Sequence, residues 1–581
     1  MLVILDIHDQ RFAFSKPRSI ISAKTIHEVP DALAAMSAAR AEGWWLAGWF
    51  AYELGYALEP RLARLLPAVD SPLLAFGLFD APHHLEGEAG RAYAGRMQPE
   101  WSAAEYAGPF AAVKEALAAG DIYQANLSLR ARFRFFGDPR GLYEQLRAAS
   151  AASYCAYLDD GACQIISASP ELFFEINQGV ISARPMKGTA ARLGDDEAER
   201  ATLAASPKDR AENLMIVDLI RNDLGRIAEI GSVEVTKLFA VETYPTLHTM
   251  VSTVTARLRK DVGIPEIIAA LFPCGSITGA PKIRAMEILR SLEASPRGAY
   301  CGSIGFFAPK EDGRARFNVA IRTLTIRGPE GELGVGGGIV QDSKCENEYS
   351  ECLVKARFFT EARRPIELIE TLKYDRAFVR LARHLNRMEE SAKALGFTFN
   401  ASLAQKALAE AVEGREGLLR VRLTLDEDGC HRATAAEFHG NQTCWVYAVA
   451  PNRVQSGDPF LRHKTNWREV LQERLMRPPL SELVLVNERG ELTEGTRSNI
   501  FVKRGSVLLT PPLTSGLLPG CLRAELLESG FCQEEVLTEA DLDGEVYFGN
   551  SLRGLVPGKR RPDLGTTVAS SGEAGRLSDC R

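Results

Sequence analysis

The motifs of this chain fall into two clusters, and this division constrains the fold more than any other feature of the sequence. The first cluster runs from about Phe12 to Lys355 and the second from about Ile366 to Arg553, with a short charged stretch at residues 357–364 between them. A chain of 581 residues also exceeds one domain, since domains average roughly 150 residues. We therefore expect two domains, residues 1–360 and 365–560, and a flexible tail at residues 561–581, where large apolar side chains are almost absent.

Composition and charge exclude several classes of protein. Hydrophobic residues make up 46% of the chain and charged residues 25%, with both signs mixed, as in ordinary globular proteins. Subtracting 75 acidic from 69 basic residues gives a net charge of −6, and without a basic block we expect no nucleic-acid partner. No apolar run approaches the roughly 20 residues of a membrane span, and the apolar start lacks the basic leader of a signal peptide. The 11 cysteines form no C-x-x-C pair, which argues against a disulfide framework or zinc cage and favours the cytoplasm.

The pattern of apolar residues predicts a mixed α+β fold. Short β-rich runs at residues 163–167 and 333–340 alternate with helical stretches, without the regular strand-helix rhythm of a doubly wound sheet. One helix is expected to end at Gly120. Another carries apolar residues at helical spacing from Leu381 to Leu395 and is expected to stop at Gly396. We interpret its apolar stripe as core.

Two pairs of acidic residues share a spacing that suits a helix face. Asp209 and Glu212 lie three apart, as do Glu348 and Glu351, and Lys355 follows four residues after the second pair. A solvated helix face with ion pairs is the ordinary explanation of such a pair. A magnesium site is the alternative, because Mg²⁺ prefers one or two carboxylates together with water and an anionic substrate.

Seven further motifs accompany the acidic pairs and support the magnesium interpretation. They are Gly120-Asp-Ile-Tyr-Gln-Ala-Asn-Leu127, Ser169-Pro-Glu-Leu-Phe173, Arg184-Pro-Met-Lys-Gly-Thr189, Phe272-Pro-Cys-Gly-Ser-Ile-Thr-Gly-Ala-Pro-Lys282, Tyr300-Cys-Gly-Ser-Ile-Gly305, Ile321-Arg-Thr323 and Gly336-Gly-Gly-Ile-Val340. In order and spacing they resemble the chorismate-utilising enzymes, the family of anthranilate synthase, aminodeoxychorismate synthase and isochorismate synthase. The resemblance covers roughly the first 360 residues. It implies a two-sheet core flanked by helices.

The resemblance also implies roles for individual residues. Glu212 and Glu351 would bind Mg²⁺, and Asp209 and Glu348 would support the ion through water. A cradle for chorismate, with its two carboxylates, would be formed by Ser276, Tyr300, Arg322, Lys355 and the amides of Gly336, Gly337 and Gly338. His248 matches the family's active-site histidine.

Two positions separate the branches of this family. Where isochorismate and salicylate synthases carry a lysine that activates water, this chain has Gln124, which disfavours water as the nucleophile. Lys187 stands where aminodeoxychorismate synthases commonly carry a lysine and anthranilate synthases a small residue. A desolvated amine there could attack ring carbon 2 of chorismate, and Glu171 would protonate the departing hydroxyl. The ordinary alternative for Lys187 is a surface lysine in a turn.

The second cluster has looser motifs. They are His463-Lys-Thr465, Asn487-Glu-Arg-Gly-Glu-Leu-Thr-Glu494-Gly-Thr-Arg-Ser-Asn499, Gly516-Leu-Leu-Pro-Gly-Cys-Leu-Arg523 and Gly549-Asn-Ser-Leu-Arg-Gly554. Over about 200 residues this series resembles the pyridoxal-phosphate enzymes of fold type IV, which include D-amino-acid aminotransferases and aminodeoxychorismate lyase. The family's usual Gly-(Ile/Val)-Thr-Arg stands here as Gly-Cys-Leu-Arg.

The fold type IV resemblance implies a site for pyridoxal 5′-phosphate. Lys464 would attach the cofactor covalently and shuttle protons, and Glu494 would keep the pyridine nitrogen protonated. The cofactor's phosphate would be bound by Arg380, the amides of Cys521 and Leu522, and the hydroxyl of Ser551. A hairpin carboxylate and a charge at the rim are the ordinary alternatives for Glu494 and Arg380. A homodimer through this domain stays open.

The fusion of the two halves predicts a bifunctional enzyme of 4-aminobenzoate synthesis. The first half would convert chorismate to 4-amino-4-deoxychorismate, and the second would remove pyruvate to leave 4-aminobenzoate. Two alternatives stay open, in which the second half is an aminotransferase or a catalytically inactive module. None of the 11 cysteines lies in the G-x-C-x-G turn of a class I amidotransferase. We therefore expect ammonia to come from a separate glutamine amidotransferase subunit.

Overall fold

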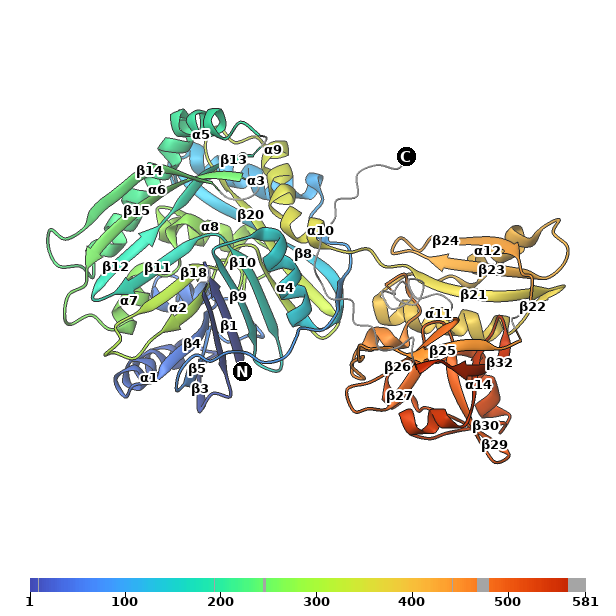
Figure 1. The fold of residues 1–581 in the computed structure, drawn as a ribbon. Coiled ribbons are helices and arrows are strands. Elements are labelled where there is room, and N and C mark those ends of the chain that lie inside the picture. The colour runs from blue at the N-terminus through green and yellow to red at the C-terminus, as the bar shows by residue number, and fades with distance from the viewer. Residues whose placement is uncertain (9, 193, 244–246, 441–442, 468–479, 563–581) are drawn as a thin grey trace. The chain divides into compact units, whose positions relative to one another are not determined.

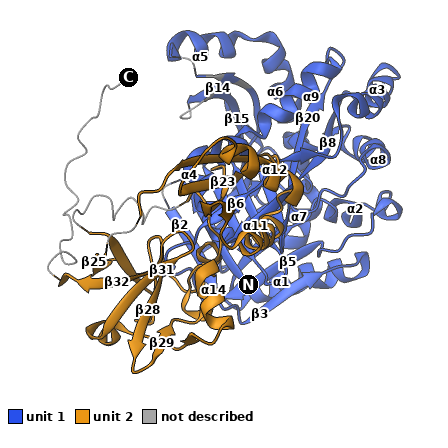
Figure 2. Ribbon diagram, turned by 90° about the vertical axis from the view of Figure 1, so that its right-hand side faces the viewer, with its two compact units in different colours: residues 1–363 blue, residues 364–581 orange. Residues whose placement is uncertain are grey.

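A computed structural model describes the chain except for residues 9, 193, 244–246, 441–442, 468–479 and 563–581 (Figure 1). The chain divides into two compact units, residues 1–363 and 364–581 (Figure 2). From residue 563 onward, the expected tail lies outside the described residues. Nowhere in the described part of the chain is a helix both long and apolar enough to cross a membrane.

The first unit is built on two ten-stranded sheets. The first sheet has the order β16 (Gly279–Ala280), β8 (Gln124–Gly137), β20 (Glu330–Ile339), β19 (Thr323–Arg327), β10 (Gln164–Ser169), β9 (Tyr154–Asp159), β1 (Leu2–Ile7) and β2 (Gln10–Ser15), while β6 (Ala92–Ala94) and β7 (Gln98–Pro99) pair with β8. The second has the order β13 (Met186–Ala191), β15 (Leu247–Arg257), β12 (Val180–Arg184), β11 (Leu172–Asn177), β18 (Ala315–Val319), β17 (Ser303–Phe307), β4 (Trp45–Phe50), β5 (Leu74–Phe79) and β3 (Ser19–Ala23), while β14 (Glu234–Thr243) pairs with β15.

Successive side chains of a strand point into two different cores, one between the two sheets and one between a sheet and its helices. In β1, Val3, Leu5 and Ile7 belong to a core shared by strands of both sheets, whereas Ile4 belongs to the core under the helices of the first sheet. Those helices are α3 (Ala103–Ala118), α4 (Pro139–Ser150), α8 (Lys282–Leu292), α9 (Cys345–Lys355) and α10 (Arg357–Ala362). The second sheet is covered by α1 (Val29–Ala41), α2 (Leu54–Leu58), α6 (Pro207–Gly225) and α7 (Ile264–Leu271) (Figure 1). The predicted two-sheet core flanked by helices is confirmed.

The second unit also mixes helices and sheets. A four-stranded sheet has the order β22 (Ala377–Phe378), β21 (Leu368–Asp375), β23 (Leu419–Leu425) and β24 (His431–Glu437), and α11 (Leu381–Leu395) and α12 (Ala401–Val412) pack on it. An eight-stranded sheet has the order β27 (Leu492–Gly495), β26 (Glu482–Val486), β25 (Trp445–Val449), β32 (Gly554–Arg560), β31 (Glu545–Asn550), β28 (Asn499–Arg504), β29 (Val507–Thr510) and β30 (Cys532–Glu534). α14 (Cys521–Glu528) contacts β30 and β31.

The helix boundaries agree with the sequence signals. α11 ends at Leu395 and is capped by Gly396 at φ 78°, a left-handed conformation that glycine adopts without a steric penalty. α3 ends at Ala118, two residues before Gly120. Its first turn is fixed by Ser102 and Glu105, which satisfy each other's backbone amides as a capping box.

Candidate active sites

In the first unit, the side chains of Lys187 and Gln124 both lie close to the backbone of Gly338. Lys187 lies within β13 and is partly buried, so it is not a surface lysine in a turn. A Cβ placed on Gly338 of β20 would lie 2.3 Å from Nε2 of Gln124 and 3.4 Å from Nζ of Lys187. Burial and then the charge of Lys355 lower the pKa of Lys187, which favours the neutral, nucleophilic amine.

Glu171 lies between β10 and β11 and is 4% exposed. Burial raises the pKa of Glu171 to about 7, against a hydrogen bond from Ser276 and the charge of Lys187. Ser276 lies in the short 3-10 turn Gly275–Ile277 and is itself buried. Oε1 of Glu171 and Oε1 of Gln124 are buried with no hydrogen-bond partner in the described protein. Orphaned polar atoms of this kind suit a pocket that binds a polar ligand.

Carboxylates from α6 and α9 lie near Lys187, since the charges of Glu212 and Glu351 both act on its amine. Burial, together with the charges of Asp209 and Glu348, raises the pKa of Glu212, although Lys187 and Lys208 oppose that rise. A Cβ on Gly337 would lie 3.2 Å from Oε2 of Glu348. Neighbouring carboxylates of this kind suit a hard divalent cation.

Lysines form ion pairs with two of the predicted metal ligands. Nζ of Lys355 lies 2.8 Å from Oε1 of Glu351, and Nζ of Lys208 lies 3.8 Å from Oε1 of Glu212. Burial would raise the pKa of Glu351, but the charges of Lys355, Lys187 and Lys208 together lower it. Across the described residues, the predicted ligands do not form a group of three donor atoms within 4.8 Å; such groups occur at two other places.

The remaining predicted substrate ligands lie along β19 and β20, which are neighbouring strands. Nζ of Lys355 donates to the carbonyl of Gly336 over 3.0 Å. Tyr300 is buried with its ring against Gly334, where a Cβ would lie 2.1 Å from the ring. Arg322 directly precedes β19 at φ 49°, and β19 pairs with β20. The fold therefore brings these residues from different segments to β20, the strand that contains Gly336, Gly337 and Gly338.

His248 is fully buried in β15, opposite Ala190 of β13. Its Nδ1 lies 3.0 Å from Oγ1 of Thr243, and its Nε2 lies 3.2 Å from Oε2 of Glu199 and 3.4 Å from Oδ1 of Asp196. Asp196 and Glu199 belong to α5 (Asp196–Ala205). Sequence reasoning missed these two partners, although acidic residues in a first helical turn were a visible signal.

In the second unit, Lys464 and Glu494 lie on different segments. Nζ of Lys464 donates to Oγ1 of Thr371 over 3.2 Å. Glu494 of β27 is 8% exposed and lies opposite Asn499 of β28 in the antiparallel pair. Nδ2 of Asn499 lies 3.5 Å from Oε2 of Glu494. Asn499 was not predicted as part of the site.

The predicted phosphate ligands meet at the N-terminus of α14. Cys521 and Leu522 open this helix and are both buried. Arg380, at φ 58° just before α11, lies with Nη1 3.4 Å from the carbonyl of Ser551 and forms an ion pair with Glu525 of α14. A helix N-terminus, a guanidinium and a hydroxyl together suit a phosphate group.

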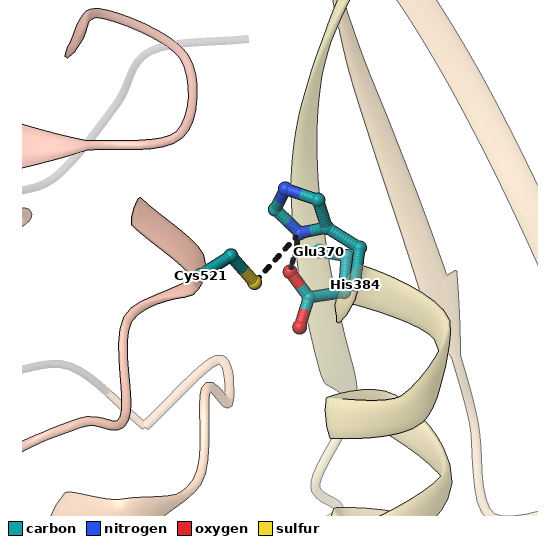
Figure 3. Close-up of side chains that lie close together, drawn as sticks. All are labelled: Glu370, His384 and Cys521. Atoms are coloured by element: carbon teal, nitrogen blue, oxygen red, sulfur yellow. Dashed lines mark hydrogen bonds and ion pairs between the residues drawn. The ribbon is translucent and has the colours of Figure 1, made fainter. Parts of the chain in front are cut away.

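Behind this cradle lies a buried polar network that sequence reasoning missed. Nδ1 of His384 lies 2.6 Å from Oε2 of Glu370 and 3.6 Å from Sγ of Cys521 (Figure 3). Nε2 of His384 lies 2.8 Å from Oγ of Ser551. Arg387 donates to Glu370 through Nε over 2.8 Å and Nη2 over 2.6 Å, and to the carbonyl of Pro519 over 2.9 Å. His384 and Arg387 lie three residues apart on α11, the helix whose apolar stripe we interpreted as core.

This network is suited to an anion rather than a metal ion. Glu370, His384 and Cys521 bring their donor atoms within 4.8 Å of one another. Arg387, however, already contacts both oxygens of Glu370. Burial lowers the pKa of His384, Glu370 opposes this effect, and the charges of Arg387 and Lys464 add to it. A divalent cation would have to enter beside both of these positive groups.

Comparisons with known proteins match both units to known families. Residues 4–361 match the family model of chorismate binding enzymes, and residues 367–560 match that of amino-transferase class IV. Aminodeoxychorismate synthase component 1 of Klebsiella aerogenes is 41% identical over 340 residues, covering 53% of this chain and 74% of that protein. Its counterpart in Salmonella typhimurium is 47% identical over 263 residues, covering 44% of this chain and 57% of that protein.

A solved structure supports the fold of the first unit. Anthranilate synthase component I from Streptococcus pneumoniae superposes with a TM-score of 0.53 at 24% identity, covering 61% of this chain and 92% of that one. The match to the chorismate binding enzymes spans more than half of the chain and includes β20, α6, α9 and Lys187. The chain therefore belongs to the chorismate binding enzyme family and carries an amino-transferase class IV domain after the chorismate binding domain.

Proposed function

We propose that this chain makes 4-aminobenzoate from chorismate in two steps. The first unit would aminate chorismate to 4-amino-4-deoxychorismate, and the second would release pyruvate from that product. The position of Lys187 carries the proposal, because its amine lies beside Gln124 and the Gly338 backbone and close enough to Glu171 for the two charges to act on each other. The names of the relatives of the first unit support the same reaction.

In the first step, Lys187 acts as the nucleophile. Its lowered pKa supplies neutral amine, which bonds to ring carbon 2 of chorismate while the bond from carbon 4 to its hydroxyl breaks. Glu171, whose pKa is about 7, protonates the departing hydroxyl so that water leaves. Ammonia then bonds to carbon 4 and expels the amine of Lys187, which restores the enzyme. Arg322, Lys355 and the amides of Gly336 to Gly338 hold the carboxylates of the substrate.

Magnesium is the cofactor that fits the carboxylates of the first unit. Glu212 and Glu351 would hold the ion, and Asp209 and Glu348 would act through water. Burial raises the pKa of Glu212, and the charges of Asp209 and Glu348 add to that rise; these neighbouring carboxylates are the observation that favours a cation there. When bound, Mg²⁺ supplies positive charge beside the carboxylates of chorismate.

In the second step, Lys464 moves a proton at ring carbon 4 of the aminated substrate. Pyridoxal 5′-phosphate, when bound, supplies an electron sink that makes this carbon acidic. Glu494 holds a proton on the pyridine nitrogen of the cofactor, and Arg380, Ser551 and the first amides of α14 hold its phosphate. The close packing of Gly520, where a Cβ would lie 1.8 Å from Oδ1 of Asn499, keeps the helix start near Glu494.

An aminotransferase is the second candidate for the second unit, because its family model is that of class IV aminotransferases. The two activities separate in one assay of the full chain with chorismate, ammonia and Mg²⁺. We expect 4-aminobenzoate and pyruvate in equal amounts without any keto acid acceptor. Dependence of product formation on an added keto acid would favour the aminotransferase, and absence of any aminated product would overturn the first step.

Lys464→Ala tests which half performs which step. The variant should lose the visible absorption of the covalently attached cofactor and accumulate 4-amino-4-deoxychorismate, because only the second step needs this amine. Retained absorption would assign the attachment to another lysine.

The relatives are named as component 1, which supports a separate amidotransferase subunit as the source of ammonia. The unpaired cysteines of the described chain fit a reducing compartment, and we place the enzyme in the cytoplasm.

A further inference from the structure

A buried chain of polar groups leads from Arg387 to the proposed phosphate site. Arg387 binds both oxygens of Glu370, Glu370 contacts Nδ1 of His384, and Nε2 of His384 contacts Oγ of Ser551. All four side chains are at most 9% exposed. Loss of a hydrogen bond in a buried network is costly, so the positions of the protons decide which hydrogen bonds can form.

The neighbours of His384 decide which of its nitrogens carries a proton. Burial opposes the charge of Glu370, but Arg387 and the hydrogen bond of His384 lower the pKa of that carboxyl far below its usual range. Glu370 is therefore an ionised carboxylate, which can only accept hydrogen bonds. Nδ1 of His384 must carry the proton of the 2.6 Å contact.

The state of Nε2 then decides what Ser551 can offer to a ligand. In the neutral ring, Nε2 is an acceptor, so the hydroxyl of Ser551 donates to it over 2.8 Å and presents only lone pairs to the phosphate site. In the imidazolium, Nε2–H donates to Oγ of Ser551, and the hydroxyl hydrogen is free to point at an anion. Only the second arrangement attracts a phosphate oxygen.

We propose that His384 couples phosphate binding at the second site to the uptake of one proton, by making Ser551 a hydrogen-bond donor only when the ring is charged. This inference rests on the proposed function, which places a phosphate monoester beside Arg380, Ser551 and the start of α14. His384 is thus a positioning residue, since it acts on the ligand through Ser551. The proton comes from solvent and adds to Nε2, and no covalent bond to the ligand is needed.

The charges around His384 favour the neutral ring until an anion arrives. Burial lowers the pKa of His384, Arg387 and Lys464 lower it further, and only Glu370 raises it. Cys521 faces the same ring with a thiol whose pKa burial raises, so it contributes no charge. A phosphate dianion beside Ser551 would reverse this balance by stabilising the imidazolium. Its binding should therefore weaken as pH rises above the pKa of His384 in the ligand-free protein.

Calorimetry on the cofactor-free full chain tests the coupling. Pyridoxamine 5′-phosphate is the first probe, because it lacks the aldehyde that reacts with Lys464, and inorganic phosphate is the second, because it lacks the ring. Each is titrated between pH 7 and 8.5 in buffers of different ionisation enthalpy, which reports the protons taken up per ligand. We expect the wild type to take up a larger fraction of a proton than His384→Gln, approaching one where affinity falls about tenfold per pH unit.

Matched variants separate the possible outcomes. His384→Gln keeps a permanent donor near Ser551, and Ser551→Ala removes the group that transmits the proton, so both should lose the extra uptake. His431→Gln, in β24 on the four-stranded sheet, is the histidine control and should retain it. Equal uptake in the wild type and in both site variants would overturn the coupling while leaving the proposed function intact. Failure of the wild type to bind pyridoxamine 5′-phosphate or pyridoxal 5′-phosphate would overturn both.

Discussion

At the scale of single residues, burial of Lys187 is the feature on which the first reaction depends. A methyl group cannot replace its amine, so Lys187→Ala should reduce formation of 4-amino-4-deoxychorismate at least a hundredfold, while supplied intermediate still yields 4-aminobenzoate. Product analysis by chromatography measures both steps. Lys237→Ala, on the exposed part of β14, is the control. Undiminished 4-aminobenzoate from chorismate in the Lys187 variant would remove the nucleophile assignment.

The raised pKa of Glu171 leads to a prediction of how the rate of the same step depends on pH. Its pKa is raised to about 7, and a general acid must carry its proton, so the active fraction falls as pH rises through that value. The neutral fraction of Lys187 rises with pH until the amine is fully deprotonated, so the loss of the acid lowers the rate only where Lys187 is already neutral. Above the higher of the two pKa values, the kcat/KM for chorismate should fall about tenfold per pH unit. Glu171→Gln should be slower by roughly 10²- to 10⁴-fold and should lack this falling limb; the same falling limb in the variant would contradict the assignment.

At the scale of elements, the glycines of β20 leave room for the side chains of Gln124 and Lys187 to lie against the backbone of this strand. A Cβ at residue 338 would lie 2.3 Å from Nε2 of Gln124, so Gly338→Ala should displace the amide and lower chorismate turnover. Overpacking of this kind costs about 1–3 kcal/mol. Gly108→Ala is the matched control, because Gly108 lies in α3 with nothing within 4 Å of its added Cβ. Thermal unfolding and steady-state rates of the two variants, compared with the wild type, measure the difference.

The predicted metal ligands on α6 and α9 lead to a prediction of metal dependence. Glu212 and Glu351 come from different helices, and a hard cation with few carboxylate ligands loses affinity when one becomes an amide. Glu351→Gln should abolish the stimulation of chorismate turnover by Mg²⁺, whereas conversion of supplied intermediate by the second unit should be unchanged. A titration of rate against Mg²⁺ is the measurement. If the variant keeps the wild-type response, the ion binds elsewhere.

At the scale of the whole molecule, the described chain offers no exposed reactive thiol in a glutaminase turn. Cys163, in the segment closest to such a turn, is partly buried, and burial raises its pKa to about 12, so it is not an activated thiolate. The purified chain should therefore use ammonia and leave glutamine intact until an amidotransferase subunit is added. Glutamate and 4-aminobenzoate are measured together. Glutamate release by the chain alone would show that it contains its own glutaminase site.

The sequence by itself determined much of the local structure. Apolar spacing and the glycine at 396 predicted the bounds of α11. The motifs also indicated both families, because residues such as Lys187 and Lys464 are recognisable from their immediate neighbours. These are signals carried within about ten residues of the chain.

Only the tertiary structure decided which side chains share a proton. His384 lies on the helix that carries the apolar stripe, and nothing in the local sequence indicates that Glu370, 14 residues away, and Ser551, 167 residues away, contact its ring. In the same way, the low pKa of Lys187 depends on burial and on Lys355, which comes from α9. Desolvation and charge act through space, so long-range folding rather than local pattern sets the chemistry of both sites.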